Sequence, residues 1–381
     1  MLLDSSNDVE IAFWKHDAQS PVIFMIDDLA NIYFDCTAGD WGGQCNQEGG
    51  LYSYLKSEII KKFTEVKFTF FLVAGKREVQ SVGEYDYALR CDQGEFPSLL
   101  KAMIGDKHEI AYHGFDHGSV VDGSFIQEWS GFNTLNEAVD KIEAGVELVR
   151  NSTGLDVKGG KYCGYESGDY GHDSIVSSEF EWWFDSWDSD HLVRPHGEFR
   201  DGVFYIPSNI DCSIYPIRMI KYLTNKKYYT SIYRQMQSGT LEAKIRQILS
   251  VKGIVSLQEH SSPIRTDGVR QYPNVFDDLE SILYILALLC EYDIWWATAS
   301  EVTAYTRCRE YLKIVRETKC SFRFNWAGEE KYNPSGSITL LVSKTISGVR
   351  TEKDFSPIYV KDGKTLVDVN VKLDALYYIV D

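Results

Sequence analysis

The chain has 381 residues, 44% of them hydrophobic and 14% aromatic, which is too apolar for a disordered chain and enough for one large and one small domain. Its formal net charge of −17 at pH 7 makes phosphate backbones and anionic lipid surfaces unfavourable partners. The first residues lack the basic and apolar regions of an export signal, and the longest apolar run, residues 282–290, is too short to cross a bilayer. These features predict a cytoplasmic protein with no nucleic-acid partner and no membrane insertion.

The eight cysteines are scattered and include no CxxC pair, which is typical of reduced thiols in the cytoplasm. Cys36 and Cys45 flank a glycine-rich segment, and they are the pair we would expect to form a disulfide if the protein were exported.

Strand-like and helical patterns alternate along residues 20–300. Short apolar runs predict strands at 21–26, 66–73, 109–112, 181–184, 254–257 and 294–297. Helical periodicity predicts helices at 51–63, 96–104, 136–153, 241–249 and 276–292. This alternation favours parallel strands covered by helices, and about seven such units favour a barrel over an open sheet. Residues 1–310 are therefore predicted to form an α/β domain, a distorted (β/α)7-type barrel.

The pattern changes to alternating polar and apolar residues in the last part of the chain. Strand-like runs occur at 321–326, 337–342, 358–360 and 367–371, and turn residues lie at 333–336 and 361–364. Residues 311–381 are therefore predicted to form a small antiparallel β domain. The sequence does not decide whether this domain binds sugar, mediates dimerisation or covers the main domain.

Two carboxylates, Asp27 and Asp28, directly follow the apolar run 24–26. Because side chains alternate on an extended backbone, the two carboxylates are expected to diverge, so that one can hold a cation while the other faces a substrate. The same pair is also typical of an Asx turn or a helix cap, so the pair alone does not decide between these interpretations.

Two imidazoles, His113 and His117, follow the predicted strand 109–112 and lie four positions apart. On a helical turn they share one face and can chelate one cation, and the end of a barrel strand is where active-site loops lie. Two solvated surface histidines are the alternative. Together with the aspartates, however, they supply the donors of a metal site that activates water.

These two runs resemble the first two motifs of the polysaccharide deacetylases with a NodB homology domain, carbohydrate esterase family four. The apolar strand ending in two aspartates matches 25–28, and His-x-x-x-His matches 113–117. The resemblance covers about residues 20–305. It implies that Asp27 is the general base and that Asp28, His113 and His117 bind a divalent metal, most often zinc.

The later motifs of that family are altered here. Its third motif falls on 159–166, which lacks the family's arginine and prolines, so the resemblance makes Lys161 the substitute cation and Tyr162 and Tyr165 candidate sugar contacts. Its fourth motif resembles 184–188 and implies that Trp187 stacks on the sugar.

In the same fourth motif, Asp185, or alternatively Asp188, would be the carboxylate that tunes the catalytic histidine. The fifth motif resembles 257–260, one residue longer than in the family, and it makes His260 the candidate general acid.

The resemblance implies a metal-dependent hydrolase that removes an N-acetyl group from an amino sugar or glycan intermediate in surface-polysaccharide biosynthesis, such as O-antigen or capsule assembly. The partner would be a carbohydrate substrate. The sequence does not identify the oligomeric state. Two alternatives remain: a non-catalytic metal- and carbohydrate-binding protein with a degenerate site, and another C–N hydrolase that cleaves a cyclic amide or a formyl group.

Overall fold

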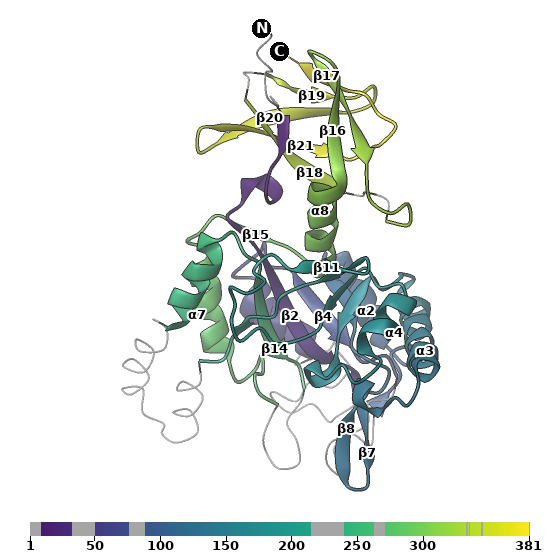
Figure 1. The fold of residues 1–381 in the computed structure, drawn as a ribbon. Coiled ribbons are helices and arrows are strands. Elements are labelled where there is room, and N and C mark those ends of the chain that lie inside the picture. Colours follow the sequence, from purple (N-terminus) through teal and green to yellow (C-terminus); the bar gives the residue numbers. More distant parts are fainter. Residues whose placement is uncertain are drawn as a thin grey trace, which may run out of the picture. The chain divides into compact units, whose positions relative to one another are not determined.

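A computed structural model describes residues 9–32, 50–75, 88–214, 240–262, 271–332, 334, 336–343 and 346–380. The chain divides into two compact units (Figure 1). The larger unit comprises Val22–Tyr292 and Trp296–Ser300, and the smaller unit comprises the described residues within Met1–Pro21, Asp293–Trp295 and Glu301–Asp381. Cys36 and Cys45 lie outside the described residues.

The larger unit is built on a curled sheet whose order is β11-β12-β10-β9-β6-β4-β2-β14-β13 (Figure 1). Its strands are β2 (Ser20–Leu29), β4 (Phe68–Leu72), β6 (Glu109–Tyr112), β9 (Gly159–Lys161), β10 (Trp182–Phe184), β11 (Glu198–Arg200), β12 (Val203–Tyr205), β13 (Ile210–Asp211) and β14 (Val255–His260). From β12 to β13 all neighbours pair in parallel, and β11 is antiparallel at the edge. A parallel bridge between Trp187 and Ser208 connects segments that follow β10 and precede β13. This architecture confirms the predicted α/β barrel-type fold.

The helices of the larger unit lie close to their predicted positions, except for α4 (Gly171–Ser177), which was not predicted. They are α1 (Leu51–Leu55), followed by a π-helical turn at Lys56–Ile60, then α2 (Phe96–Gly105), α3 (Leu135–Thr153), α4, a helix at 240–250, and α7 (Leu279–Leu289). No helix in the described parts of the chain is long and apolar enough to cross a membrane.

Helix α3 shows why these boundaries were predictable. The Thr134 hydroxyl caps the helix by accepting the Glu137 N–H at 3.1 Å, and the Glu137 carboxylate accepts the N–H of the preceding residue, Asn133, at 3.0 Å. Gly154 ends the helix with a φ of 80°, in the left-handed conformation that glycine adopts without strain.

Strand β2 is the centre of the core and carries the first candidate site residues. All ten of its residues are buried. Its register with β4 pairs Ile26 with Phe70 and Leu29 with Leu72, so that Asp27 and Asp28 together lie opposite one residue. This is a β-bulge, and Asp28 takes a φ of 66° within it. The bulge redirects the side chains at the point where the strand ends.

Two glycines in β9 allow aromatic side chains to approach the backbone closely. A Cβ on Gly159 would lie 2.2 Å from the Trp182 ring, and one on Gly160 would lie 2.3 Å from the Tyr112 carbonyl oxygen. The segment that resembles the family's third motif is therefore a buried strand followed by a 3-10 turn at Cys163–Tyr165, and it places Lys161 at the carboxyl end of the strand.

The smaller unit contains an antiparallel sheet, which confirms the predicted antiparallel β character of the C-terminal part. Its order is β1-β18-β21-β20-β19-β22-β17-β16. The strands are β1 (Val9–Ile11), β16 (Leu312–Thr318), β17 (Ser321–Trp326), β18 (Ser337–Val342), β19 (Gly348–Arg350), β20 (Phe355–Lys361), β21 (Lys364–Asn370) and β22 (Tyr377–Val380). Strand β1, from near the start of the chain, extends this sheet by pairing with β18, which the sequence patterns did not predict.

The remaining elements include β15 (Ile294–Trp296), which pairs with β2 in the sheet of the larger unit. The others are β3 (Asn31–Ile32) paired with β5 (Ala88–Leu89), the hairpin β7 (Gly118–Val121) and β8 (Ser124–Gln127), and α8 (Ala299–Tyr311). The hairpin directly follows His117 and was not predicted from the sequence.

Candidate metal centre and active site

The candidate residues come from the ends of four strands of one parallel sheet. Asp27 and Asp28 end β2, His113 follows β6, Lys161 ends β9 and His260 ends β14. In the register of β14 with β2, His260 lies opposite Asp27. Because the carboxyl ends of parallel strands meet at one edge, residues far apart in the sequence converge there.

Both imidazoles of the His-x-x-x-His run point a ring nitrogen at one carboxylate oxygen. Oδ1 of Asp28 lies 3.5 Å from Nε2 of His113 and 3.1 Å from Nε2 of His117. All three side chains are buried. The Nδ1–H of His113 donates to the carbonyl oxygen of Lys161 at 3.0 Å, and the Ser262 hydroxyl donates to Oδ2 of Asp28 at 2.7 Å. Each of these hydrogen bonds fixes the orientation of a side chain whose other polar atom could bind a metal ion.

This donor set fits a divalent cation. Ligands bound at zinc distances in a tetrahedral site lie about 3.3 Å from one another, and the separations of 3.1 and 3.5 Å bracket that value. The bond from His113 to a carbonyl selects the neutral tautomer with its lone pair on Nε2. Two imidazoles and a carboxylate are the ligands of a catalytic zinc site.

A second grouping contains a thiol. Ligand atoms of His113, His117 and Cys163 lie within 4.8 Å of one another. The Sγ–H of Cys163, however, donates to the main-chain carbonyl of His113 at 3.2 Å, whereas the Nε2 atoms of both histidines approach Oδ1 of Asp28. Asp28 therefore directs a carboxylate oxygen toward both histidines, whereas the thiol of Cys163 is bonded to the backbone.

Asp27 forms a buried ion pair with Lys161. Nζ of Lys161 donates to Oδ2 of Asp27 at 2.5 Å, and both side chains are almost completely excluded from solvent, at 1% and 2% exposure. Burial lowers the pKa of Lys161, but the Asp27 carboxylate and Tyr165 together outweigh burial, and the pKa lies above its usual value. Oδ1 of Asp27 accepts no hydrogen bond from any described residue. The ion pair thus fixes Oδ2 of Asp27 and leaves Oδ1, which is also buried, without a hydrogen-bond donor among the described residues.

His260 reaches the same carboxylate despite the extra residue in its motif. Its Nε2 lies 3.8 Å from Oδ2 of Asp27, and its Nδ1–H donates to the carbonyl oxygen of Pro273 at 2.8 Å. Burial lowers the pKa of His260, and the positive charge of Lys161 adds to this effect, while Asp28 and Asp27 oppose it. The ring is therefore neutral near pH 7 in the metal-free site, with its lone pair on Nε2.

Asp185 is held by two arginines. Nη2 of Arg194 donates to Oδ1 of Asp185 at 2.6 Å, and Arg200 donates to Oδ2. Asp188, the alternative candidate, accepts from Nε of Arg194 at 2.7 Å. The position predicted for a carboxylate beside the Nδ1 of His260 is taken instead by the Pro273 carbonyl. The structure places Asp185 against two arginines, whereas His260 Nδ1 bonds to Pro273.

The three aromatic candidates have different surroundings. Tyr162 is 1% exposed and packs between Trp129 and Trp183, so it belongs to the core and cannot be a sugar platform. Tyr165 lies with its ring 4.2 Å from the Lys161 ammonium and donates to Oε1 of Gln258 at 2.5 Å.

Trp187 is the candidate aromatic that keeps an accessible face. It is 36% exposed, and its ring centroid lies 6.3 Å from that of Tyr165. Trp187 and Tyr165 therefore connect the surface to the buried Lys161–Asp27 pair, which is the arrangement expected of residues that border a substrate.

Glu128, Ser262 and Gln258 are site residues that sequence reasoning missed. Glu128 accepts backbone N–H bonds from the loop that carries both histidines, and Gln258 lies 3.4 Å from Oδ2 of Asp27. Burial raises the pKa of the Glu128 carboxyl to about 7, while Lys141 and the backbone N–H groups oppose the shift. Glu128 accepts the N–H of His117, which lies eleven positions earlier in the chain. No local sequence pattern predicts a hydrogen bond at this separation.

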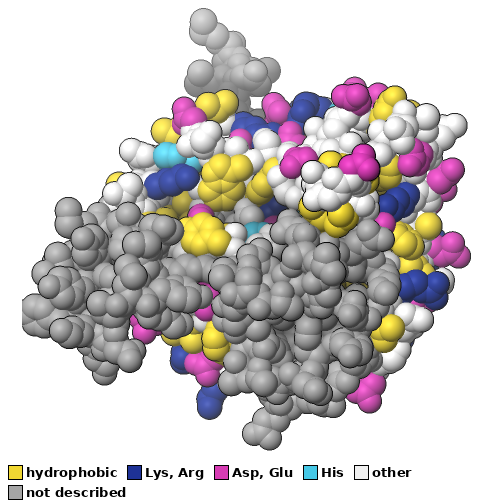
Figure 2. Space-filling view, turned by 90° about the horizontal axis from the view of Figure 1, so that it is seen from below, with side chains coloured by type: hydrophobic (Ala, Val, Ile, Leu, Met, Phe, Trp, Pro, Cys, Tyr) yellow, Lys and Arg dark blue, Asp and Glu magenta, His cyan; other side chains and the backbone are white. Residues whose placement is uncertain are grey.

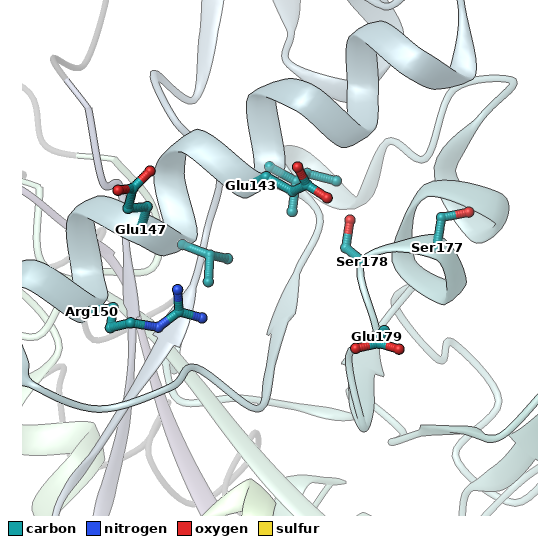
Figure 3. A pocket seen from close by; sticks show the side chains of 8 residues that line it. Glu143, Glu147, Arg150, Ser177, Ser178 and Glu179 are labelled. Atoms are coloured by element: carbon teal, nitrogen blue, oxygen red, sulfur yellow. The ribbon is translucent and has the colours of Figure 1, made fainter. Parts of the chain in front are cut away.

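Two hollows lie away from these residues. One, of about 440 Å³, lies between α3 and α4 and is bordered by Glu143, Glu147, Arg150 and Glu179 (Figure 3). The other, of about 560 Å³, lies in the smaller unit beside Arg323 and Tyr378. Neither contains a candidate metal ligand. Figure 2 views the side toward which hairpin β7–β8 projects in Figure 1, and acidic, basic and hydrophobic side chains are mixed on its described part.

Comparisons with known proteins were made at three levels. No protein-family model matches the chain, and no curated protein matches it. Among solved structures, the chain is similar to the Puue allantoinase, with 14% identity and a TM-score of 0.47 over 77% of this chain and 92% of that chain. It is also similar to a putative polysaccharide deacetylase from Mycobacterium smegmatis, with 15% identity and a TM-score of 0.47 over 79% and 94%. A probable polysaccharide deacetylase from Pseudomonas aeruginosa PAO1 has 14% identity and a TM-score of 0.46 over 77% and 92%.

Proposed function

We propose that the larger unit is a metal-dependent hydrolase that removes an N-acetyl group from an amino sugar. The observation that carries this proposal is the division of labour between two adjacent carboxylates. Asp28 faces both histidines, whereas Asp27 is paired with Lys161 and keeps Oδ1 open. A protein that only bound metal would not need the second, buried carboxylate, because burying a charged pair carries a large desolvation penalty.

Asp28, His113 and His117 would hold the cation. We propose zinc, because two imidazoles and one carboxylate with room for further ligands suit it. When bound, such an ion lowers the pKa of a water molecule and polarises an amide carbonyl.

Asp27 would act as the general base. Its Oδ2 is engaged by Lys161 at 2.5 Å, so its open Oδ1 is the atom that accepts a proton from the attacking water. The Lys161 ammonium holds this carboxylate in place inside the protein. Lys161 therefore supports the base rather than touching the sugar.

His260 would deliver a proton to the departing nitrogen. An amine leaves poorly unless it is protonated, so the site needs a donor on the other side of the amide. Nε2 of His260 lies 3.8 Å from Oδ2 of Asp27, beyond direct hydrogen-bond distance, so the proton that Oδ1 takes from water would reach His260 through a bridging water molecule. The bond from its Nδ1–H to Pro273 keeps the lone pair on Nε2, where that proton must be received. The products would be acetate and a free amino sugar.

The sugar would be bound beside Trp187 and Tyr165, because a pyranose ring stacks on an accessible indole. We propose a glycan intermediate of cytoplasmic surface-polysaccharide assembly as the substrate. The acidic chain, with a net charge of −17, disfavours polyanionic polymers as alternatives.

The test is acetate release by the purified full chain loaded with zinc and incubated with N-acetylglucosamine oligosaccharides and nucleotide-linked N-acetyl sugars. We expect equal amounts of acetate and new primary amine, loss of both after removal of the metal by a chelator, and recovery when zinc is restored. Zinc binding without acetate or formate release from any of these compounds would show a binding protein. Ring opening of a cyclic amide without acetate release would show a different C–N hydrolase.

A further inference from the structure

The loop that carries both histidines is built around one buried carboxylate. Glu128 is 3% exposed and accepts the N–H groups of three consecutive residues: Phe115 at 2.9 Å to both oxygens, and Asp116 at 2.9 Å and His117 at 3.0 Å to Oε2. Successive N–H groups that converge on one acceptor form a nest. Glu128 thus fixes the backbone between the two predicted metal ligands.

Glu128 stabilises an unfavourable backbone conformation at His117. His117 has a φ of 71°, in the left-handed region that costs a residue with a side chain on the order of 1–3 kcal/mol. The N–H of that same residue donates to Glu128. The carboxylate therefore offsets strain at the residue whose Nε2 must face Asp28.

Gly114 shows that the loop is shaped to admit this carboxylate. It has a φ of 89°, and a Cβ built on it would lie 2.7 Å from Oε2 of Glu128 and 3.1 Å from Sγ of Cys163. A side chain at this position would displace the carboxylate from its three donors. The absence of a side chain at Gly114 thus leaves the space that the Glu128 carboxylate occupies.

The hairpin β7–β8 brings Glu128 to the loop. It begins directly after His117 and ends directly before Glu128, whose own N–H donates to the His117 carbonyl at 3.2 Å. The Phe125 ring on β8 lies 6.2 Å from the His117 ring. The hairpin therefore brings Glu128 back beside His117, where the two residues are joined by backbone and side-chain hydrogen bonds.

We propose that Glu128 is a positioning residue that sets the affinity of the His113–His117 loop for its metal and the geometry of the catalytic site. The inference rests on the proposed function, because it takes His113 and His117 as the ligands. Glu128 touches neither the ligand nitrogens nor the substrate. It acts through the backbone of the loop.

The test compares zinc affinity and kinetics in full-length variants. Glu128→Gln keeps the size but replaces one oxygen by an NH2 group that faces the Phe115 N–H, and Glu128→Asp keeps the charge but shortens the reach. Orienting partners of metal ligands typically change affinity or activity 10- to 100-fold when they are replaced. We expect the zinc Kd, from competition with a chromophoric chelator, to rise about 10- to 100-fold in Glu128→Gln and less in Glu128→Asp. We expect kcat to fall while KM stays constant.

Two controls separate this role from a general loss of structure. Glu147→Gln removes one exposed carboxylate from α3 and should leave zinc affinity and kcat unchanged, and His113→Ala should lose the metal. Unfolding of the metal-free variants measures the structural contribution alone. A Glu128→Gln protein with wild-type zinc affinity and kcat would overturn the inference, whether or not its stability falls. If the wild-type protein itself binds no zinc, the proposed function fails instead.

Discussion

At the scale of single residues, Lys161 joins the two halves of the site. Its ammonium pairs with Asp27, and its carbonyl accepts the Nδ1–H of His113. The predicted cation of the third motif is therefore a buried partner of Asp27. This contact depends on β9 and β2 belonging to one sheet, which no local sequence pattern specifies.

Removing the Lys161 charge should destabilise the protein. Lys161→Met leaves Asp27 buried without its cation, and breaking one partner of a buried pair costs about 3–5 kcal/mol. We expect a free energy of unfolding lower by about that amount in urea at pH 7. A double-mutant cycle with Asp27→Asn provides the control. Strictly additive losses would show that the pair does not couple the two side chains.

At the scale of elements, His108 connects α2 to the sheet. It lies between α2 and β6, and its Nδ1 accepts the Phe68 N–H at the start of β4 at 3.2 Å. Its ring contacts those of Phe68 and Phe70. Burial lowers the pKa of His108 from 6.5 to about 4. The unfolded chain therefore binds a proton at His108 in a pH range where the folded chain does not.

This shift predicts a loss of stability in acid. Because the folded pKa lies below the unfolded one, stability is full above pH 6.5 and falls as the pH decreases from 6.5 toward 4, by roughly 3 kcal/mol in total. The His108→Asn variant keeps an acceptor for the Phe68 N–H but cannot titrate. Urea unfolding between pH 7 and pH 4.5 should show a shallower decline for the variant, and an identical decline in both proteins would contradict this assignment.

Elements differed in how well the sequence predicted them. Helix α3 carries its own caps and a clear period, and β17 alternates polar and apolar residues, so their bounds followed from local pattern. The hairpin β7–β8 has short, largely exposed strands and lacks such a period. The bulge in β2 and the arginine partners of Asp185 depend on tertiary pairing, which local patterns do not encode.

At the scale of the whole molecule, the chain consists of two compact units, and the candidate site belongs to the larger one. We propose, as the sequence predicts, that the boundary lies near residue 310 and that the smaller unit folds with its own core. Its buried residues Phe322, Phe324 and Tyr377 form an aromatic cluster, with Phe322 and Tyr377 stacked at 5.2 Å. Each large side chain buried in this way contributes about 1.5–3 kcal/mol.

Metal should therefore stabilise one unit selectively. A ligand at a thousand times its Kd adds about 4 kcal/mol to the state that binds it. Calorimetry with zinc and with a chelator should show two transitions, of which zinc raises only one. A single transition that shifts as a whole would show one cooperative unit, and a thermogram unchanged by zinc would contradict a metal site in the larger unit.

The central claim is that Asp27 performs chemistry beside a metal that it does not hold. Its most direct test is acetate release by Asp27→Asn, measured on protein whose zinc content is determined in the same sample. We expect about one zinc per chain, as in the wild-type protein, and acetate release reduced at least 100-fold, the contribution typical of a general base. Loss of the zinc in Asp27→Asn, or acetate release at the wild-type rate, would contradict the division of roles between Asp27 and Asp28.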